Sequence, residues 1–356
     1  WLILERICDY MRILHSLLLE LPPAESEFEQ QVFDFCQKWR EGTTAFLFHS
    51  SGSTGDPKPI LITRERMYAS AKMTGEWLKL AKGDVALLSL SPTYIAGAMV
   101  LVRALVLDLG LVFVEPCQNP LENLPSMTIH LASFVPTQWS TMLAAGINFK
   151  NYFSSAKGIL LGGARVPDRF RMDMGFPVYE TYGMTETVSH IALAKIDGNE
   201  LVYKTLPKVK IGVDKENKLW IEAPMAKEAR LQTNDLVILL DKNTFKWIGR
   251  ADFTINSGGI KIQAESLEAE MENCINLIYG NVSFFVIGQK DQKLGEKVVL
   301  FIETSSNEEK KAQELLNEFK DKLQKYHCPK NIYFLPEFIR TASGKINRTK
   351  TSQICF

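Results

Sequence analysis

The sequence predicts an α/β fold, with a large N-terminal α/β domain of mostly parallel sheets and a small, mobile C-terminal α+β domain. The first observation is the alternation of β-like apolar runs with helical stretches from about Glu41 to Val213, which is typical of βαβ units. The second is a change of pattern after Ile211, where short strands follow one another with turns between them. The chain has 356 residues and is 46% hydrophobic, enough for two cores.

The first part alternates strands and helices in chain order. Its strands are short apolar runs, and its helices carry apolar residues at helical spacing. The predicted elements are a strand at 44–50, a helix at 63–80, a strand at 84–90, a helix at 98–108, a strand at 110–115, a helix at 136–145 and a strand at 158–163.

The second part begins with strands and ends with an amphipathic helix. We expect the domain boundary at residues 250–251, which divides the chain into 1–250 and 251–356 with a hinge near Asp252. The predicted elements are strands at 218–224, 235–240, 245–250, 252–257 and 260–263, a helix at 265–274, strands at 282–288 and 297–303 and a helix at 308–326.

Composition argues against several partners. The 41 basic and 41 acidic residues give a formal net charge of zero, whereas nucleic-acid binding needs a basic excess or stripe. The apolar run at 97–115 is interrupted by Arg103 and Asp108, which predicts a helix followed by a buried strand and no membrane span. The six cysteines are scattered without a C-x-x-C pair, which favours thiols in a reducing cytosol. We therefore expect a soluble, cytoplasmic protein. The sequence leaves open whether residues precede Trp1 and whether the protein forms an oligomer.

The stretch "SSGSTGDPK" at 50–58 is rich in hydroxyl groups and glycine, a composition that suits phosphate oxygens. It does not fit a Walker A loop, because Gly55 is followed by Asp56 and Pro57 and not by Lys and Ser or Thr. It does not fit a dinucleotide fingerprint either, because only Gly52 and Gly55 are present. By itself the loop remains equally compatible with an ordinary turn between a strand and a helix.

Four further motifs follow this loop in order. They are "YETYGMTET" at 179–187, "LQTND" at 231–235, "IGRADFTINSGGIKIQAESLEAE" at 248–270 and "RTASGKINRTK" at 340–350. Together the five resemble the signatures of the adenylate-forming enzymes, the superfamily of acyl- and aryl-CoA ligases. The resemblance implies an AMP-forming acid–thiol ligase that uses ATP, Mg²⁺ and coenzyme A as co-substrate. In its two half-reactions a carboxylate attacks the α-phosphate of ATP, and a thiol then displaces AMP.

The resemblance also implies roles for residues of the nucleotide site. Tyr182 would lie against adenine, Thr185 would contact the α-phosphate, Glu186 would bind the metal, and Asp235 would accept from the ribose hydroxyls with help from Arg250. Asn234 replaces a usual glycine, but asparagine tolerates left-handed backbone angles, so we expect the turn at this position to survive. The other nucleotide-binding positions that it implies are Ser50, Ser51, Gly52, Ser53, Thr54, Gly55, Lys58, Gly163, Ala164 and Gly183. For Lys58 a solvated lysine at a helix start is equally compatible.

The resemblance implies that Lys345 is the catalytic lysine, whose ammonium would lie between the attacking carboxylate and the α-phosphate. Asp252 resembles the family hinge. The small domain would swing about it between the half-reactions, so that Ser257, Gly258 and Gly259 would then bind the pantetheine arm of CoA.

The carboxylate substrate is less fully specified. No carboxylate lies between Asp84 and Asp108, which argues against an amino acid. Within the superfamily the motifs are most similar to the o-succinylbenzoate–CoA ligase branch of menaquinone biosynthesis, which implies an acyl pocket made by Tyr94, Arg103, Gly162, Ser189 and His190. Two of these residues are also compatible with a purely structural role: Arg103 as a helix arginine paired at the surface, and His190 as a histidine packed in the core. Tyr94 also replaces a histidine that this branch often has.

Three alternatives stay open: another aryl- or medium-chain acyl-CoA ligase, a stand-alone adenylation domain, and a non-catalytic nucleotide-binding scaffold. Only 49 residues precede Ser50, so we expect the first N-terminal subdomain of such enzymes to be reduced or absent. The expected partners are a small carboxylic acid, ATP and CoA, without nucleic acid.

Overall fold

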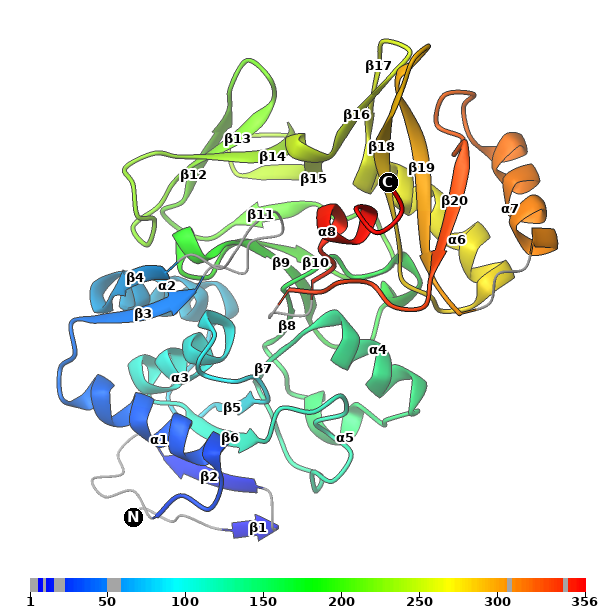
Figure 1. Cartoon of the computed structure of the whole chain (residues 1–356). Coiled ribbons are helices and arrows are strands. Elements are labelled where there is room, and N and C mark those ends of the chain that lie inside the picture. The colour runs from blue at the N-terminus through cyan, green and yellow to red at the C-terminus, as the bar shows by residue number, and fades with distance from the viewer. Residues whose placement is uncertain (1–5, 9–10, 16–22, 50–58, 306–308, 342–344) are drawn as a thin grey trace.

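The computed structural model describes residues 6–8, 11–15, 23–49, 59–305, 309–341 and 345–356. Figure 1 shows a larger part at the N-terminal side and a smaller part, with α6, α7 and α8, at the C-terminal side. The helices are α1 (Glu27–Arg40), α2 (Arg64–Leu78), α3 (Ile95–Leu107), α4 (Pro136–Ala144), α5 (Lys150–Phe153), α6 (Ala264–Tyr279), α7 (Glu309–Lys322) and α8 (Arg348–Ser352). Three 3-10 turns are η1 (Asp168–Phe170), η2 (Thr185–Thr187) and η3 (Ala251–Phe253).

Twenty strands are assigned within the described residues. Those of the larger part are β1 (Arg6–Cys8), β2 (Met11–His15), β3 (Ala45–His49), β4 (Pro59–Thr63), β5 (Val85–Leu88), β6 (Gly110–Val114), β7 (Leu131–Phe134), β8 (Gly158–Leu161), β9 (Val178–Gly183), β10 (His190–Lys195), β11 (Tyr203–Thr205), β12 (Lys210–Val213), β13 (Lys218–Glu222), β14 (Leu231–Leu239) and β15 (Thr244–Arg250). Those of the smaller part are β16 (Thr254–Ser257), β17 (Ile260–Gln263), β18 (Phe284–Asp291), β19 (Gly295–Glu303) and β20 (Asn331–Leu335).

The main sheet has 13 strands in the order β1-β2-β6-β5-β7-β8-β9-β10-β11-β15-β14-β13-β12. Its centre, β6-β5-β7-β8-β9, is parallel, as the βαβ alternation predicts. From β9 to β12 every pairing is antiparallel. Short connections such as those between β13, β14 and β15 cannot join parallel neighbours, so the sheet is mixed and not mostly parallel.

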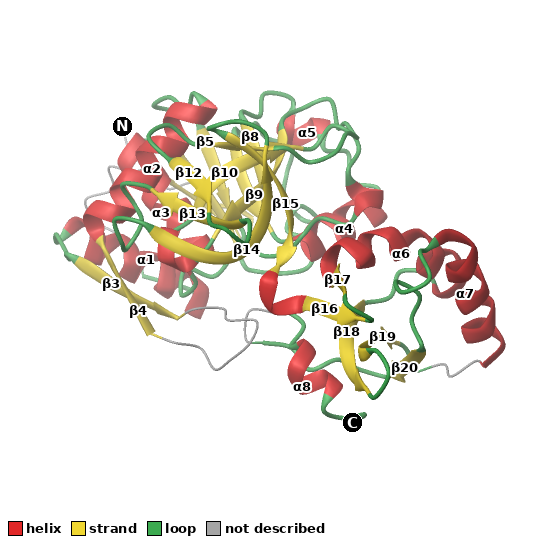
Figure 2. Cartoon of the chain, turned by 90° about the horizontal axis from the view of Figure 1, so that it is seen from above, coloured by secondary structure: helices red, strands yellow, loops and turns green. Residues whose placement is uncertain are grey.

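Helices cover both sides of the parallel strands (Figure 2), with α1, α2 and α3 on one side and α4 and α5 on the other. The α3 helix packs on β5, β6 and β7 and against α2. The two helices approach closely because position 75 is glycine: a Cβ there would lie 2.7 Å from Leu107 Cδ1. This contact brings the inner face of α2 toward the polar groups of the site described below.

The smaller part has its own sheet, in the order β17-β16-β19-β18, with β20 added parallel to β19. Buried apolar side chains from Phe28 to Phe245 form one cluster, and those from Ile255 onward form two others. The predicted α/β class with a smaller α+β part is thereby confirmed. The boundary at residue 250 falls between these clusters, and independent motion of the two parts stays a prediction.

Two local predictions differ from the structure. The strand at 44–50 was expected to lead into a helix, yet β3 pairs antiparallel with β4 in a separate two-stranded sheet. The strands β7, β9 and β10 were not anticipated, since short apolar runs lack a decisive period. The helix α1 was also missed, although its buried apolar residues recur at helical spacing. Within the described residues, none of the helices combines the length and apolarity that a membrane crossing would need.

Candidate active site

Asp235 is the centre of a buried polar group that joins three strands. Its register partner across β14 and β15 is Arg250. The Tyr182 hydroxyl, on β9, donates to one carboxylate oxygen at 2.7 Å, and the Trp247 indole N–H donates to the other at 3.2 Å. Since each carboxylate oxygen has two acceptor sites, both oxygens keep capacity for a ribose hydroxyl.

Tyr182 is buried, and its ring makes edge contacts with Tyr203 and Phe245 at centroid separations of 5.9 and 5.2 Å. Burial, followed by the Asp235 carboxylate, raises the pKa of the Tyr182 hydroxyl well above its ordinary value. The hydroxyl therefore remains a donor that orients Asp235 over the whole working pH range. The predicted contact of this ring with adenine stays a prediction.

The turn expected at Asn234 is not present. Residues 231–239 form the continuous strand β14, and Asn234 is not among the residues with positive φ. The segment is an extended strand that needs no left-handed residue. Asparagine is therefore accommodated without strain at this position.

Thr185 and Glu186 lie in η2, directly after β9. From α2, Arg66 donates to the Glu186 carbonyl at 2.6 Å and to the Met225 carbonyl at 2.8 Å. The Lys227 amide also donates to the Glu186 carbonyl. Two donors thus fix the Glu186 carbonyl of the turn, and Arg66 also ties the turn to Met225, while the Glu186 side chain stays half-buried.

A single carboxylate suits Mg²⁺, which commonly takes one or two carboxylates together with phosphate oxygens and water. The described residues contain no group of three or more His, Cys, Asp or Glu side chains placed to hold a metal by themselves. The donor set around Glu186 therefore fits a magnesium ion that arrives with a nucleotide.

Between Glu186 and Ser189 the chain makes a strained γ-turn. Val188, at its centre, has φ 65° and ψ −57°, and the Ser189 amide donates to the Thr187 carbonyl at 2.7 Å. Positive φ is unfavourable for a β-branched residue, and this type of γ-turn is rare. The Thr187 hydroxyl donates to the Met184 and Ser189 carbonyls, which holds the turn closed.

A buried polar group lies on the other side of this turn. The Arg103 guanidinium donates to the Ser189 hydroxyl at 2.9 Å, the His190 Nδ1 lies 3.3 Å from that hydroxyl, and the His190 Nε2 lies 3.0 Å from the Thr74 hydroxyl. Arg103 is 2% exposed, so the surface alternative for this residue was wrong. Arg103, Ser189 and His190, predicted for the acyl pocket, therefore meet in the structure.

The charges of this group are unusual. Burial lowers the pKa of the Arg103 guanidinium to about 10. Burial, followed by the charge of Arg103, lowers the pKa of His190 well below its ordinary value. The imidazole is thus neutral at pH 7. No carboxylate of the described residues pairs with Arg103, and its Nε has no hydrogen-bond partner.

The remaining acyl-pocket and backbone positions lie nearer solvent. Tyr94 is the N-cap of α3 and is 44% exposed, whereas Arg103 lies further along the same helix and is buried. Gly163 has φ 90°, and it and Ala164 are exposed after β8, next to half-buried Gly162. Gly183 ends β9 where a Cβ would lie 2.3 Å from the Ser189 carbonyl oxygen, so only glycine fits there.

Lys345 precedes α8 and comes close to the Asp235 group. Its amide donates to the Thr341 hydroxyl at 3.2 Å, and its carbonyl accepts from the Thr341 amide. Burial lowers the pKa of its ammonium, Arg250 lowers it further and Asp235 opposes them. Two predicted site residues more than a hundred positions apart, Asp235 and Lys345, therefore interact electrostatically.

The phosphate-loop positions 50–58 lie outside the described residues. The segment joins β3 to β4, whose ladder ends at the pair His49 and Pro59. Its predicted role in phosphate binding stays a prediction.

The predicted hinge and CoA segment lie in the smaller part. Asp252, in η3, accepts from Arg250 at 2.5 Å. Gly258 and Gly259 have φ 61° and 82° and form the two-residue turn between β16 and β17, a geometry that favours glycine at both positions. Buried Ser257 precedes this turn. Neither the swing about Asp252 nor contact with CoA is tested by these positions.

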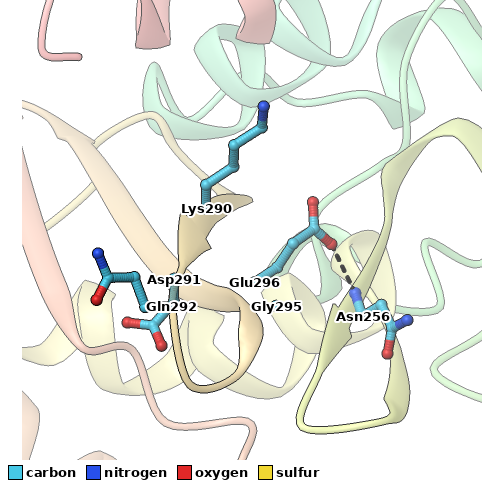
Figure 3. Close-up of a pocket in the computed structure, with 6 residues that line it drawn as sticks. All are labelled: Asn256, Lys290, Asp291, Gln292, Gly295 and Glu296. Atoms are coloured by element: carbon cyan, nitrogen blue, oxygen red, sulfur yellow. Dashed lines mark hydrogen bonds between the residues drawn. The ribbon is translucent and has the colours of Figure 1, made fainter.

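A pocket of about 570 Å³ lies beside this hairpin (Figure 3). It is lined by Asn256, Lys290, Asp291, Gln292, Gly295 and Glu296. The Asn256 amide donates to the Glu296 carboxylate at 2.7 Å, which ties β16 to β19 at its edge. Its mixture of charges favours no single ligand class.

Sequence reasoning missed three residues of the site: Arg66, Thr74 and Trp247. Arg66 and Thr74 lie in a helix whose sequence signals only helix formation, and their partners are more than a hundred positions away. Trp247 lies three residues before Arg250, which the motif did indicate. Its place in the same short strand as Arg250 was the signal that could have pointed to it.

Three features together define the adenylate-forming class of enzymes: a mixed α/β sheet with a Tyr-Gly-x-Thr-Glu turn, a buried aspartate on a hairpin strand, and a lysine from the small C-terminal part. The AMP-binding enzyme family matches residues 12–218, more than half of the chain, and the AMP-binding enzyme C-terminal domain matches residues 270–345. The chain therefore belongs to the AMP-binding enzyme family. This confirms the predicted AMP-forming acyl/aryl-CoA ligase superfamily, whose members bind ATP.

Similar proteins carry related names. The chain is 27% identical to a 2-succinylbenzoate–CoA ligase of Lactococcus lactis over 85% of this chain and 70% of that protein, and 27% identical to one of Bacillus cereus (strain Q1) over 93% and 73%. A solved acyl-CoA synthetase (AMP-forming)/AMP-acid ligase II-like protein from Dyadobacter fermentans is 37% identical, with a TM-score of 0.64 over 97% of this chain and 99% of that one. The O-succinylbenzoate coenzyme A synthetase of Bacillus subtilis, in complex with ATP and magnesium ion, shares the fold at 22% identity and a TM-score of 0.67 over 86% of this chain and 69% of that one.

Proposed function

We propose that the protein converts o-succinylbenzoate, ATP and CoA into o-succinylbenzoyl-CoA, AMP and pyrophosphate, as a cytoplasmic step of menaquinone biosynthesis. The observation that carries the choice of substrate is Arg103, a buried guanidinium without a carboxylate partner among the described residues. Two relatives of 27% identity are named 2-succinylbenzoate–CoA ligases, which supports the same choice.

The chemistry of the buried group agrees with a substrate that carries a second carboxylate. A buried charge is costly unless it is paired, so the group around Arg103 favours an anion that completes its hydrogen bonds. Ser189 and neutral His190 extend this group by one hydroxyl and one imidazole. They offer a donor to the keto group that o-succinylbenzoate also carries.

In the first half-reaction the carboxylate oxygen attacks the α-phosphorus of ATP and pyrophosphate leaves. Asp235, oriented by Tyr182 and Trp247, would accept from the ribose hydroxyls. Thr185 would donate to the α-phosphate, and Lys345 would place its positive charge between the two reacting anions. A magnesium ion held through Glu186 would neutralise charge on the phosphates.

In the second half-reaction the CoA sulfur attacks the acyl carbonyl, AMP leaves and the thiol proton is released. This step would need the smaller part to turn about Asp252 and present the Gly258–Gly259 turn in place of Lys345. A turn with no side chains at its tip admits a narrow pantetheine arm close to the backbone.

The test is acid-dependent pyrophosphate release with ATP and Mg²⁺ across o-succinylbenzoate, benzoates, fatty acids and amino acids, with and without CoA. We expect turnover on o-succinylbenzoate, its CoA thioester as product, and loss of release in Lys345→Ala. An Arg103→Met variant should lose o-succinylbenzoate more strongly than benzoate. Turnover on another acid alone would replace the substrate, and ATP binding without release on any acid would favour the scaffold alternative.

A further inference from the structure

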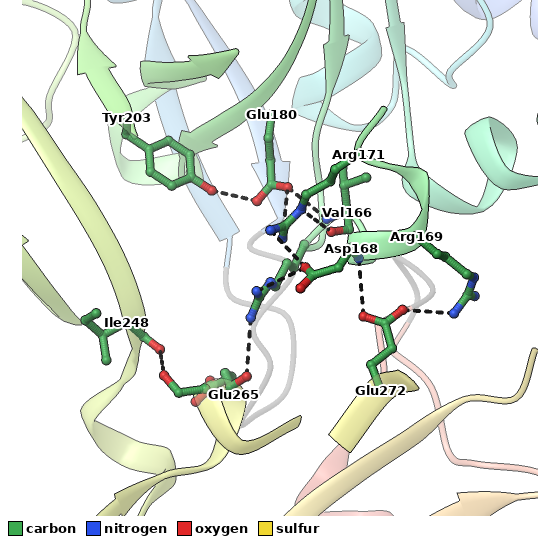
Figure 4. A network of polar contacts seen from close by, with 11 residues as sticks. Val166, Asp168, Arg169, Arg171, Glu180, Tyr203, Ile248, Glu265 and Glu272 are labelled. Carbon is green, nitrogen blue, oxygen red and sulfur yellow. Dashed lines mark hydrogen bonds and ion pairs between the residues drawn. The ribbon is translucent and has the colours of Figure 1, made fainter. Parts of the chain in front are cut away.

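The smaller part is docked on the larger one through a group of polar contacts from α6 (Figure 4). Glu272 accepts from the Arg169 guanidinium at 2.9 Å and from the Asp168 amide at 3.2 Å. In the first turn of the same helix, the Glu265 carbonyl accepts from Arg165 at 3.3 Å. We call Arg165, Asp168 and Arg169 together with Glu265 and Glu272 the α6 clasp.

The larger-domain side of the α6 clasp is held in place independently of α6. Arg171 pairs with Asp168 at 2.8 Å and donates to the Val166 carbonyl at 3.0 Å. Buried Glu180 accepts from the Val166 amide at 3.0 Å and from the Tyr203 hydroxyl at 2.6 Å. Because Glu180 is two residues before Tyr182 on β9, the clasp is anchored on the strand that orients Asp235.

The smaller-domain side leads to the catalytic lysine. One turn before Glu272, Glu268 pairs with Arg348 at 2.7 Å. Arg348 is three residues after Lys345, and its guanidinium lies 4.6 Å from the ring centroid of Phe253 in η3. The helix α6 therefore connects the clasp residues 165–169 of the larger part to the segment that carries Lys345 and to the region of the predicted hinge.

We propose that the Arg169–Glu272 ion pair is the positioning contact that holds Lys345 at the Asp235 group for adenylation and that opens before the thiol step. This inference rests on the proposed two-step reaction. Arg169 and Glu272 touch no substrate, so they would act only through the placement of α6. Because the pair is half-buried, its loss should slow adenylation about tenfold rather than abolish it.

The experiment measures the two half-reactions separately in the full-length protein. Arg169→Glu and Glu272→Arg should each slow acid-dependent pyrophosphate release about tenfold and leave the reaction of isolated acyl-adenylate with CoA unchanged or faster. The double variant Arg169→Glu/Glu272→Arg should recover part of the adenylation rate, since it restores the ion pair but not the acceptor for the Asp168 amide. Glu270→Gln, an exposed carboxylate on the same helix, is the matched control and should change neither step.

A merely structural contact would give another pattern. Equal losses in both half-reactions that follow a lower melting temperature, or a double variant no faster than the singles, would overturn the proposal.

A second readout does not depend on activity. Hydrogen exchange of the Asp168 amide should quicken in Glu272→Arg, since that amide loses its acceptor. Unchanged exchange would mean that the α6 clasp does not form. If the wild-type protein activates no acid, the proposed function fails, while the exchange experiment still decides whether the clasp exists.

Discussion

Asp235 and Arg250 face each other as register partners across β14 and β15, at the end of the ladder where the chain enters the smaller part. The Asp252 carboxylate, two residues after Arg250, accepts a hydrogen bond from the Arg250 guanidinium at 2.5 Å. The proposed ribose acceptor and the proposed hinge are therefore linked through one arginine. A nucleotide bound at Asp235 would lie next to the point about which the smaller part is expected to turn.

Replacing Asp235 with asparagine should weaken ATP binding. The amide keeps one acceptor but loses the charge, and its NH₂ would face a donor, either Tyr182 or Trp247. Loss of charge-assisted hydrogen bonds costs roughly 1.5–3 kcal/mol, so we expect the KM for ATP to rise at least about tenfold. Steady-state kinetics at saturating acid measure the KM for ATP, with Asp321→Asn, at an exposed position of α7, as control. An unchanged KM for ATP would remove Asp235 from the nucleotide site.

Replacing Arg66 with alanine should disturb the proposed magnesium site at Glu186, although Arg66 itself would not bind the ion. The guanidinium donates to the Glu186 carbonyl at 2.6 Å and to the Met225 carbonyl at 2.8 Å, and its loss leaves the Lys227 amide as the donor to the Glu186 carbonyl. We expect the Mg²⁺ concentration for half-maximal rate to rise about tenfold, the scale of one or two lost charge-assisted hydrogen bonds. A magnesium titration measures the effect, and Lys72→Ala on the same helix should not show it. Equal magnesium dependence in the two variants would contradict a role of Arg66 in placing Glu186.

Patterns of short range predicted much of the fold. The helix at 64–78 and the strands from β13 to β19 follow from local periodicity and turn residues, and the structure places them close to the expected bounds. Contacts that depend on distant segments were not predictable. The bond from Arg66 to the Glu186 carbonyl joins residues 120 positions apart, and β3 was paired with β4 across a loop whose composition signals only a turn.

The candidate site was predictable as a set of residues but not as a geometry. Motif order indicated Tyr182, Asp235 and Lys345, whereas the hydroxyl of Tyr182 on the Asp235 carboxylate follows only from the pairing of distant strands. The burial of Arg103 is a similar case. A single arginine in an apolar run is compatible with a surface or a buried position, and the packing of α2 on α3 decides between them.

At Val188 a glycine variant should be more stable than an alanine variant, the reverse of the usual order of stability. Alanine retains the strain of φ 65°, whereas glycine adopts positive φ freely, and the two remove nearly the same buried side chain. We expect Val188→Gly to unfold with a free energy about 1 kcal/mol higher than Val188→Ala. Val178, equally buried in regular β9, is the control, and there the alanine variant should be the more stable. The same order at both positions would show that the turn is not strained.

His190 should make the protein less stable in acid. Its pKa is lowered in the folded state, first by burial and then by Arg103, so below about pH 6.5 the unfolded chain binds a proton that the folded chain does not. Stability therefore falls as the pH drops from about 6.5 toward the lowered folded-state value, by at most about 1.4 kcal/mol per pH unit. The variant His190→Gln can still form a hydrogen bond with the Thr74 hydroxyl, but it has no group that takes up a proton in this pH range.

Denaturant unfolding from pH 8 to pH 5 measures the difference. The free energy of unfolding of the wild type should fall relative to that of His190→Gln below about pH 6.5, and stay parallel to it above. His49→Gln, at an exposed position, should follow the wild type throughout. A wild-type curve parallel to that of His190→Gln down to pH 5 would mean that the imidazole is protonated in the folded state. The Arg103 group would then hold two positive charges, and its preference for an anion would be stronger than proposed.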